Sequence, residues 1–168
     1  MEAKYTKAYK NIGGGITEDE AEALYRLANK SKGAIVEIGS LRGMSTVCLA
    51  GGKKKVYAID THERGTEEEF DANTKDFKNI VKMTMTSERA AKDFDKPVGL
   101  IFIDGDHDYE AVRLDFDLWY PKLVKGGWMA FHDSDSWTGV IKLMDEVMND
   151  KYFTNMPLIG SMRYAKKV

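Results

Sequence analysis

The fold class of this chain is decided by one stretch of sequence, AIVEIGSLRGMST at residues 34–46. It opens with a short, mostly apolar and β-branched segment, which predicts a buried strand. Gly39 and Gly43 then predict a tight turn from the strand into a helix, which lets a ligand approach the backbone. Because Leu41 stands between them, the spacing differs from the G-x-G-x-x-G of nicotinamide dinucleotide sites. Glu37 would also repel a pyrophosphate, so the turn favours a cationic or hydroxyl-rich ligand.

The alternation of strand and helix patterns continues on both sides of this stretch. Upstream, Thr17 and Glu20 form the pattern of a capping box, followed by an apolar face at helical spacing. Downstream, further strands and a terminal hairpin are expected at 56–60, 80–84, 100–103, 128–131 and 158–164. Strands that alternate with helices form βαβ units, so we expect an α/β, doubly wound, Rossmann-like parallel sheet with helices on both faces.

Length and charge limit the class of protein. A chain of 168 residues suggests one domain spanning residues 1–168, with residues 1–13 as an N-terminal extension. Twenty-five Lys and Arg against 27 Asp and Glu give a net charge of −2. That balance supplies no overall field for holding a polyanion, so neither a nucleic acid nor an anionic membrane is indicated as a partner.

The single cysteine and the lack of long apolar runs indicate the compartment. Cys48 alone cannot form an internal disulfide or a cysteine-based zinc site, and its apolar surroundings predict a buried thiol. The first residues lack the apolar segment of a secretory signal, and no run approaches the roughly 18 apolar residues that span a bilayer. We therefore expect a cytoplasmic protein with no membrane partner.

The residues at the strand ends matter most, because ligands of parallel sheets bind beyond the carboxyl ends of the strands. Asp60 ends the second strand, 21 residues after Gly39, an offset at which an acidic residue commonly accepts hydrogen bonds from ribose hydroxyls. Its alternative role is that of a helix N-cap. The turn and Asp60 together predict a mononucleoside site without a phosphate cradle. His62, after Thr61, is a further candidate at this mouth, with an exposed loop histidine as the alternative.

Carboxylates and imidazoles gather after the fourth and fifth strands, in IDGDHDY at 103–109 and FHDSD at 131–135. Asp104 and the pair His132-Asp133 directly follow buried strands, where polar groups need partners. A cation, substrate hydroxyls or a role as a base would supply one. The alternative for Asp104 is that it only orders the loop through backbone N–H groups. Asp106 or Asp108 is expected to start the next helix, and Tyr109 to pack it.

Together with LVKGGWMAFHD at 123–133, these motifs resemble the class I S-adenosylmethionine-dependent methyltransferases. More narrowly, the chain is similar to a family with an I-D-G-D-H-x-Y signature, related to small-molecule and sugar O-methyltransferases and to cephalosporin-hydroxylase-like proteins. The resemblance spans about residue 14 to the C-terminus. It implies a mostly parallel, seven-stranded sheet whose last strand is antiparallel. It also implies O-methylation of a small hydroxylated acceptor such as a sugar; the alternative is a non-catalytic nucleoside-binding accessory or assembly protein.

The resemblance further implies which residues bind the cofactor, S-adenosylmethionine. Asp60 would bind the ribose and Ser87 would lie near the adenine. The whole expected set is Glu37, Gly39, Ser40, Gly43, Ser45, Asp60, Thr61, His62, Ser87 and Asp104. The brevity of the chain leaves little material for a lid over the acceptor, so we also expect a homodimer in which a second subunit supplies one.

The expected catalytic residues are Asp104, His107, His132 and Asp133. Methyl transfer is an in-line displacement whose reactivity the cofactor carries, but an alcohol must also lose its proton. His107 or His132 would act as the base, or a metal would lower the pKa of the hydroxyl. Many relatives bind Mg²⁺ at the positions of Asp104 and Asp133. Since His132 stands where several of them have Asp, the resemblance leaves the Mg²⁺ open.

Overall fold

The computed structural model describes residues 8–168. Their strands form one mixed sheet. Its order is β3-β2-β1-β4-β5-β8-β6, with β7 paired to β8 beside this path. The strands are β1 (Ala34–Ile38), β2 (Val56–Asp60), β3 (Ile80–Thr84), β4 (Val98–Ile103), β5 (Leu123–Phe131), β6 (Phe153–Thr154), β7 (Leu158–Ile159) and β8 (Met162–Lys167). The first five are parallel, and β8 is antiparallel to β5. The expected sheet, its antiparallel end and the terminal hairpin are confirmed.

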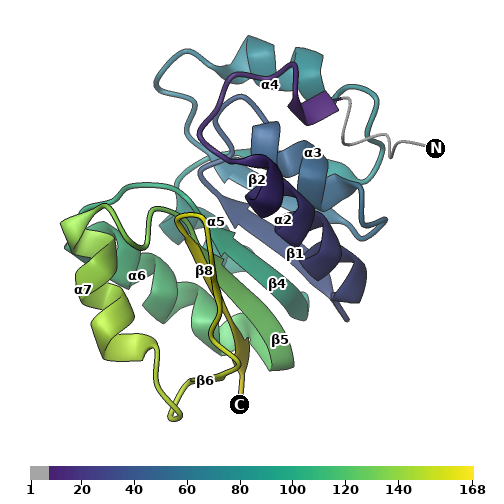
Figure 1. Cartoon of the computed structure of the whole chain (residues 1–168). Coiled ribbons are helices and arrows are strands. Elements are labelled where there is room, and N and C mark those ends of the chain that lie inside the picture. Colours follow the sequence, from purple (N-terminus) through teal and green to yellow (C-terminus); the bar gives the residue numbers. More distant parts are fainter. Residues whose placement is uncertain (1–7) are drawn as a thin grey trace.

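Helices cover both faces of this sheet (Figure 1). One face carries α2 (Glu18–Lys30) and α3 (Met44–Ala50), and the other carries α5 (Ser87–Asp93), α6 (Tyr109–Trp119) and α7 (Thr138–Val147). α4 (Glu67–Thr74) lies beside α3, and the short 3₁₀ helix Tyr120–Lys122 follows α6. Alternate strand residues fill the two apolar layers, with Phe102 facing α2 and α3 and Ile101 facing the other helices. Every residue of β4 is buried, as a strand covered on both faces requires.

Two element bounds differ from the sequence-based expectation. β4 begins at Val98 and β5 begins at Leu123, both earlier than predicted. The pairing of β4 with β5 shifts register between Val98 and Leu100, opposite the segment that contains Gly126, whose φ is 74°. Because of this irregularity, β5 begins at Leu123 and continues through Gly126 and Gly127, a pair that is typical of a turn.

The helix and core predictions near the N-terminus are confirmed. Thr17 N donates to Glu20 Oε2 at 2.7 Å and Glu20 N to Thr17 Oγ1 at 3.4 Å, which completes the capping box. Cys48 is fully buried, and burial raises the pKa of its thiol. Of the expected extension, residues 1–7 lie outside the described part, while Tyr9 and Ile12 pack into the core beside α2. In residues 8–168, the structure contains no helix with the length and apolarity that a bilayer span requires.

The strand order reverses between β1 and β4, so their carboxyl ends flank the place where parallel sheets bind ligands. Gly39 follows β1 with a φ of 86°, and a Cβ there would collide with the backbone carbonyl oxygen of Asp104. Only glycine fits, because both the left-handed backbone and the contact exclude a side chain. The turn after β1 therefore lies directly against the residue that ends β4.

Candidate functional site

The first part of the site is the turn after β1, called here the glycine turn (residues 39–43). Glu37, at its base, is fully buried, and its Oε2 accepts a hydrogen bond from Thr46 Oγ1 at 2.5 Å. Glu37 Oε1 and the hydroxyl of Ser40 are both buried without a hydrogen-bond partner in residues 8–168. Burial raises the pKa of Glu37 to about 7, although hydrogen bonds from Ser45 and Thr46 oppose the shift. Glu37 is thus a buried carboxyl group whose Oε2 is hydrogen-bonded, while its Oε1 has no hydrogen-bond partner in the described residues.

Asp60 ties the glycine turn to the end of β2. Its Oδ2 accepts from the backbone N–H of Leu41 at 2.8 Å, and its Oδ1 from that of His62 at 2.7 Å. His62 is buried, with Nδ1 3.0 Å from Thr66 Oγ1, so the exposed-loop alternative for this histidine is wrong. Thr61 lies between them and is partly buried. The carboxylate keeps lone pairs for a further donor, because two oxygens accept up to four hydrogen bonds.

Ser87 starts α5, and its hydroxyl faces α6. Its Oγ accepts a hydrogen bond from Trp119 Nε1 at 2.8 Å and is hydrogen-bonded to Asp115. Asp115 is itself buried, and burial raises the pKa of its carboxyl to about 6. The sequence analysis did not single out this acid, because it lies within the apolar periodicity of α6.

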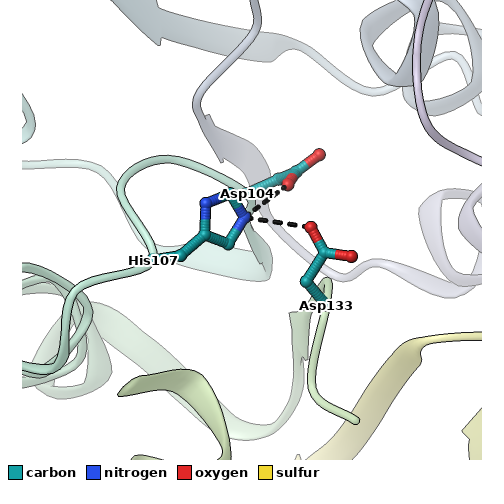
Figure 2. Close-up of side chains that lie close together, drawn as sticks. All are labelled: Asp104, His107 and Asp133. Carbon is teal, nitrogen blue, oxygen red and sulfur yellow. Dashed lines mark ion pairs between the residues drawn. The ribbon is translucent and has the colours of Figure 1, made fainter. Parts of the chain in front are cut away.

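The second part is the acid–imidazole cluster, formed by Asp104, His107, His132 and Asp133. Figure 2 shows His107 directed at the carboxylates of both aspartates, with Nε2 3.7 Å from Asp104 Oδ1 and 3.0 Å from Asp133 Oδ2. His132 Nδ1 faces the same two oxygens, at 3.5 Å and 3.4 Å. Asp133 adopts a left-handed backbone, with φ 52°, in the turn after β5. The carboxylate of Asp104 thus contacts two imidazoles, which favours the site role over that of ordering the loop.

His132 is held from behind by residues far away in the sequence. Its Nε2 lies 3.2 Å from Ser161 Oγ, in the turn between β7 and β8. Ser161 in turn donates from its N–H and its hydroxyl to Glu20 Oε1, at 2.8 and 3.0 Å. Glu20 therefore has two functions, since its other oxygen closes the capping box of α2. The sequence analysis recognised only the second of these functions.

Asp104, His107 and His132 shift one another's proton affinity, and Asp133 adds to the shifts of the two histidines. Burial opposes ionisation of Asp104, but the neighbouring His107 and His132 outweigh it and lower the pKa of that carboxyl. Asp104 raises the pKa of His107 above 6.5. Burial alone would lower the pKa of His132, yet the surrounding carboxylates raise it to about 9. The cluster is a mutually charged group, unlike the lone carboxyl of Glu37.

An exposed indole borders the cluster on its solvent side. Trp137 is 53% exposed and stacks on His107, with ring centroids 4.7 Å apart and planes at 21°.

Asp108 occupies the position before α6 without a side-chain capping bond; Asp106 Oδ1 accepts from its N–H at 3.0 Å. Tyr109 joins α6 to α7 by donating its hydroxyl to Glu146 at 3.0 Å. Asp108 therefore stands at the expected start of α6 without the expected side-chain cap, whereas Tyr109 packs α6 as expected.

A model of a family described as "Methyltransferase domain" matches residues 36–134, from β1 through the turn after β5. The match covers more than half of the chain. The chain belongs to this methyltransferase family. Both the glycine turn and the acid–imidazole cluster lie inside the matched segment, whereas Glu20, Trp137 and Ser161 lie outside it.

The chain is also similar to one uncharacterised protein in sequence and to solved methyltransferase structures in fold. An uncharacterised protein, R132, of Acanthamoeba polyphaga mimivirus is 29% identical over 174 residues, which cover 90% of this chain and 78% of that protein. An O-methyltransferase from Bacillus cereus, solved with S-adenosylhomocysteine, has a TM-score of 0.76 at 16% identity and covers 99% of this chain and 89% of its own. An rRNA methylase from Streptococcus thermophilus has a TM-score of 0.70 at 17% identity, over 92% of this chain and 99% of its own. The expected class I methyltransferase fold is confirmed.

Proposed function

We propose that this methyltransferase transfers the methyl group of S-adenosylmethionine to a hydroxyl group of a small acceptor, such as a sugar. One observation carries the proposal: the unpartnered carboxyl oxygen of buried Glu37 lies at a glycine turn that touches Asp104. The cofactor's ammonium group would give Glu37 the charged partner that it lacks. The turn would thereby place the sulfonium methyl group beside the acid–imidazole cluster.

The other expected cofactor residues fit the same orientation. Asp60, at the end of β2, keeps acceptor capacity for the ribose hydroxyls beyond its two backbone donors. The unpartnered hydroxyl of Ser40 lies in the turn itself. Ser87 Oγ accepts from Trp119 Nε1 and is hydrogen-bonded to Asp115, so we propose that Ser87 orders the adenine side of the pocket through α5 rather than by its own oxygen. The Bacillus cereus relative solved with S-adenosylhomocysteine supports this choice of cofactor.

His107 is the better candidate for the base that removes the acceptor's proton. Its side chain is 24% exposed, whereas that of His132 is 5% exposed and lies behind the two aspartates. A base must reach the proton that it takes, so accessibility favours His107. Asp104 and Asp133 would orient the ring and bind acceptor hydroxyls. Holding the hydroxyl in line with the methyl group and sulfur would supply several kcal/mol through orientation.

Trp137 suggests where the acceptor lies. Its exposed indole extends the face of His107 at the mouth of the cluster. A flat aromatic or the apolar face of a sugar would pack there, while its hydroxyls face the aspartates. This chemistry agrees with a small hydroxylated acceptor.

The Mg²⁺ of many relatives fits these residues poorly. Mg²⁺ requires an octahedron of oxygen ligands. Asp104 and Asp133 supply oxygens, but His107 and His132 direct nitrogens at the same place. We therefore assign no step of the reaction to Mg²⁺.

Calorimetry with S-adenosylhomocysteine is the decisive first experiment. Binding at micromolar concentration would support the cofactor site, and its absence at millimolar concentration would refute the proposal. Methyl transfer is then measured with a panel of sugars, phenols and an rRNA fragment, because one structural relative is an rRNA methylase. Tight cofactor binding without transfer to any acceptor would favour the non-catalytic alternative, against which the acid–imidazole cluster counts.

Light scattering tests the proposed homodimer, and the cytoplasmic location stays a prediction.

A further inference from the structure

The acid–imidazole cluster is an alternating ring of two oxygens and two nitrogens. Asp104 Oδ1 and Asp133 Oδ2 each face both His107 Nε2 and His132 Nδ1, at 3.0–3.7 Å. In the described part of the chain, neither nitrogen has a hydrogen-bond partner, although both atoms are buried. His132 is itself 95% buried, with a relative exposure of 5%. Four donor atoms therefore point at one small space.

The spacing of these atoms suits a cation better than direct hydrogen bonds. Ligand atoms about 2.1 Å from a tetrahedral metal ion lie about 3.4 Å apart. The two distances from His132 Nδ1 are 3.5 and 3.4 Å, and those from His107 Nε2 are 3.7 and 3.0 Å. Ordinary N–H···O bonds are about 2.7–3.2 Å long, so three of the four contacts are too long.

The contacts behind His132 determine which of its nitrogens is free to bind. A carboxylate only accepts, so Ser161 must direct its hydroxyl proton at Glu20 Oε1, 3.0 Å away. The oxygen of Ser161 then accepts from His132 Nε2, which must carry the proton. Because Nε2 keeps its proton, Nδ1, which faces the two aspartates, is the nitrogen at which a cation can replace a proton. Histidines that bind metals usually donate their outer N–H to such a partner.

We infer that Asp104, Asp133 and Nδ1 of His132 bind a divalent transition-metal cation such as Zn²⁺, Co²⁺ or Mn²⁺ in preference to Mg²⁺. Imidazole nitrogen mixed with carboxylate oxygen is the donor set of these ions, whereas Mg²⁺ prefers oxygen alone. Three ligands from the ends of β4 and β5 leave a fourth corner, where His107 Nε2 also faces the two aspartates and Trp137 stacks on its ring. Catalytic metal sites keep a fourth position for water or substrate, and the partly exposed His107 would border it or fill it when no acceptor is bound. Only the purpose of the cation, lowering the pKa of an acceptor hydroxyl, rests on the proposed function.

Metal titration tests the inference without any acceptor. Protein freed of metal by a chelator is titrated with Co²⁺, monitored by the absorption of the bound ion, and with Zn²⁺, Mn²⁺ and Mg²⁺ by calorimetry. We expect Co²⁺ to bind at least about 10²-fold more tightly than Mg²⁺. Equal affinity for the two ions, or no binding of either at millimolar concentration, would overturn the inference. If neither ion binds, protons rather than a cation lie between the carboxylates and the imidazoles of the cluster.

Variants identify the ligand. His132→Ala is expected to lower Co²⁺ affinity by about 10²-fold, and Ser161→Ala, which frees Nε2, by about 10-fold. His132→Asp replaces the nitrogen by oxygen and should move the preference toward Mg²⁺. Thr17→Ala is the matched control, because it removes a hydroxyl from Glu20 without touching Ser161 or His132. Unchanged Co²⁺ affinity in Ser161→Ala and a folded His132 variant would refute the assignment. Affinity for S-adenosylhomocysteine, measured on the same samples, reports separately on the proposed cofactor site.

Discussion

The glycine turn and the acid–imidazole cluster lie side by side, yet they are built in opposite ways. The glycine turn is local: Glu37 bonds to Thr46, and Leu41 bonds to Asp60. The cluster depends on a bond between Ser161 and Glu20, 141 positions apart. Their electrostatics also differ, since the pKa of Glu37 is raised and that of Asp104 is lowered. Burial raises the pKa of Glu37, whereas the two neighbouring imidazoles lower the pKa of Asp104 in spite of burial.

The largest effect is expected where the two regions touch. Gly39→Ala should destabilise the protein by about 4 kcal/mol, because the new Cβ meets the carbonyl oxygen of Asp104 on a left-handed backbone. Urea denaturation measures the free energy of unfolding. Gly65→Ala is the matched control: its φ is 71° and no described atom lies within 4 Å, so it should cost only about 1 kcal/mol. Equal losses in the two variants would show that the contact between turn and cluster is unimportant.

The opposite pKa shifts predict opposite pH dependence. The pKa of Glu37 in the folded state, about 7, lies above the 4.5 of the unfolded chain. Its contribution is therefore full below pH 4.5 and is lost as the pH rises through 7, by about 3 kcal/mol. Glu37→Gln should remove that loss. The free energy of unfolding of the variant, relative to that of the unsubstituted protein, should therefore be higher at pH 8 than at pH 4.

Asp104 provides the comparison for this pH experiment. Its lowered pKa means that it stabilises the folded state above the unfolded value of 3.8 and loses that effect as the pH falls through the folded value. Asp104→Asn should therefore destabilise the protein at neutral pH, with a smaller loss in acid. Thermal unfolding across the pH range measures both variants. The same sign of change in the two at pH 8 would contradict the contrast.

Rates of methyl transfer and affinities for the cofactor should distinguish the two regions. His107→Ala should lower methyl transfer by about 10²-fold or more, the usual effect of a lost base. Its affinity for S-adenosylhomocysteine should stay the same, because in residues 8–168 the ion pairs of His107 are with Asp104 and Asp133 and not with the glycine turn. Asp60→Ala should show the opposite pattern: its main effect should be a lower affinity for S-adenosylhomocysteine. If His107→Ala retains full activity, the base lies elsewhere.

The smallest expected effect concerns the mouth of the cluster. Trp137→Ala should raise the KM for the acceptor by up to about 10-fold with a small change in kcat, since the exposed indole would bind but not react. Trp137→Phe should recover most of the loss by keeping an aromatic face. Acceptor saturation curves at a fixed cofactor concentration measure this. A loss confined to kcat would instead mean that Trp137 acts by positioning His107.

Most of the fold was predictable because its signals are local. The apolar runs of β1, β2 and β4, the capping box at Thr17 and the glycine spacing each reflect a physical preference of neighbouring residues. The early start of β5 was not predictable, since Gly126 reads as a turn until a register shift against β4 absorbs it. Asp104 and Asp133 were found by their place after buried strands, a consequence of parallel topology.

The sequence by itself determined the strand order along the chain, the methyltransferase motifs and the acids and histidines at the strand ends. Only the tertiary structure decided how those groups face one another. It buries His62, sets His132 behind the two aspartates, and brings Ser161 and Glu20 to its outer nitrogen. The physical reason is range: strands and caps follow from neighbouring residues, whereas the direction of a ring nitrogen follows from partners that only the packed chain brings within hydrogen-bonding distance.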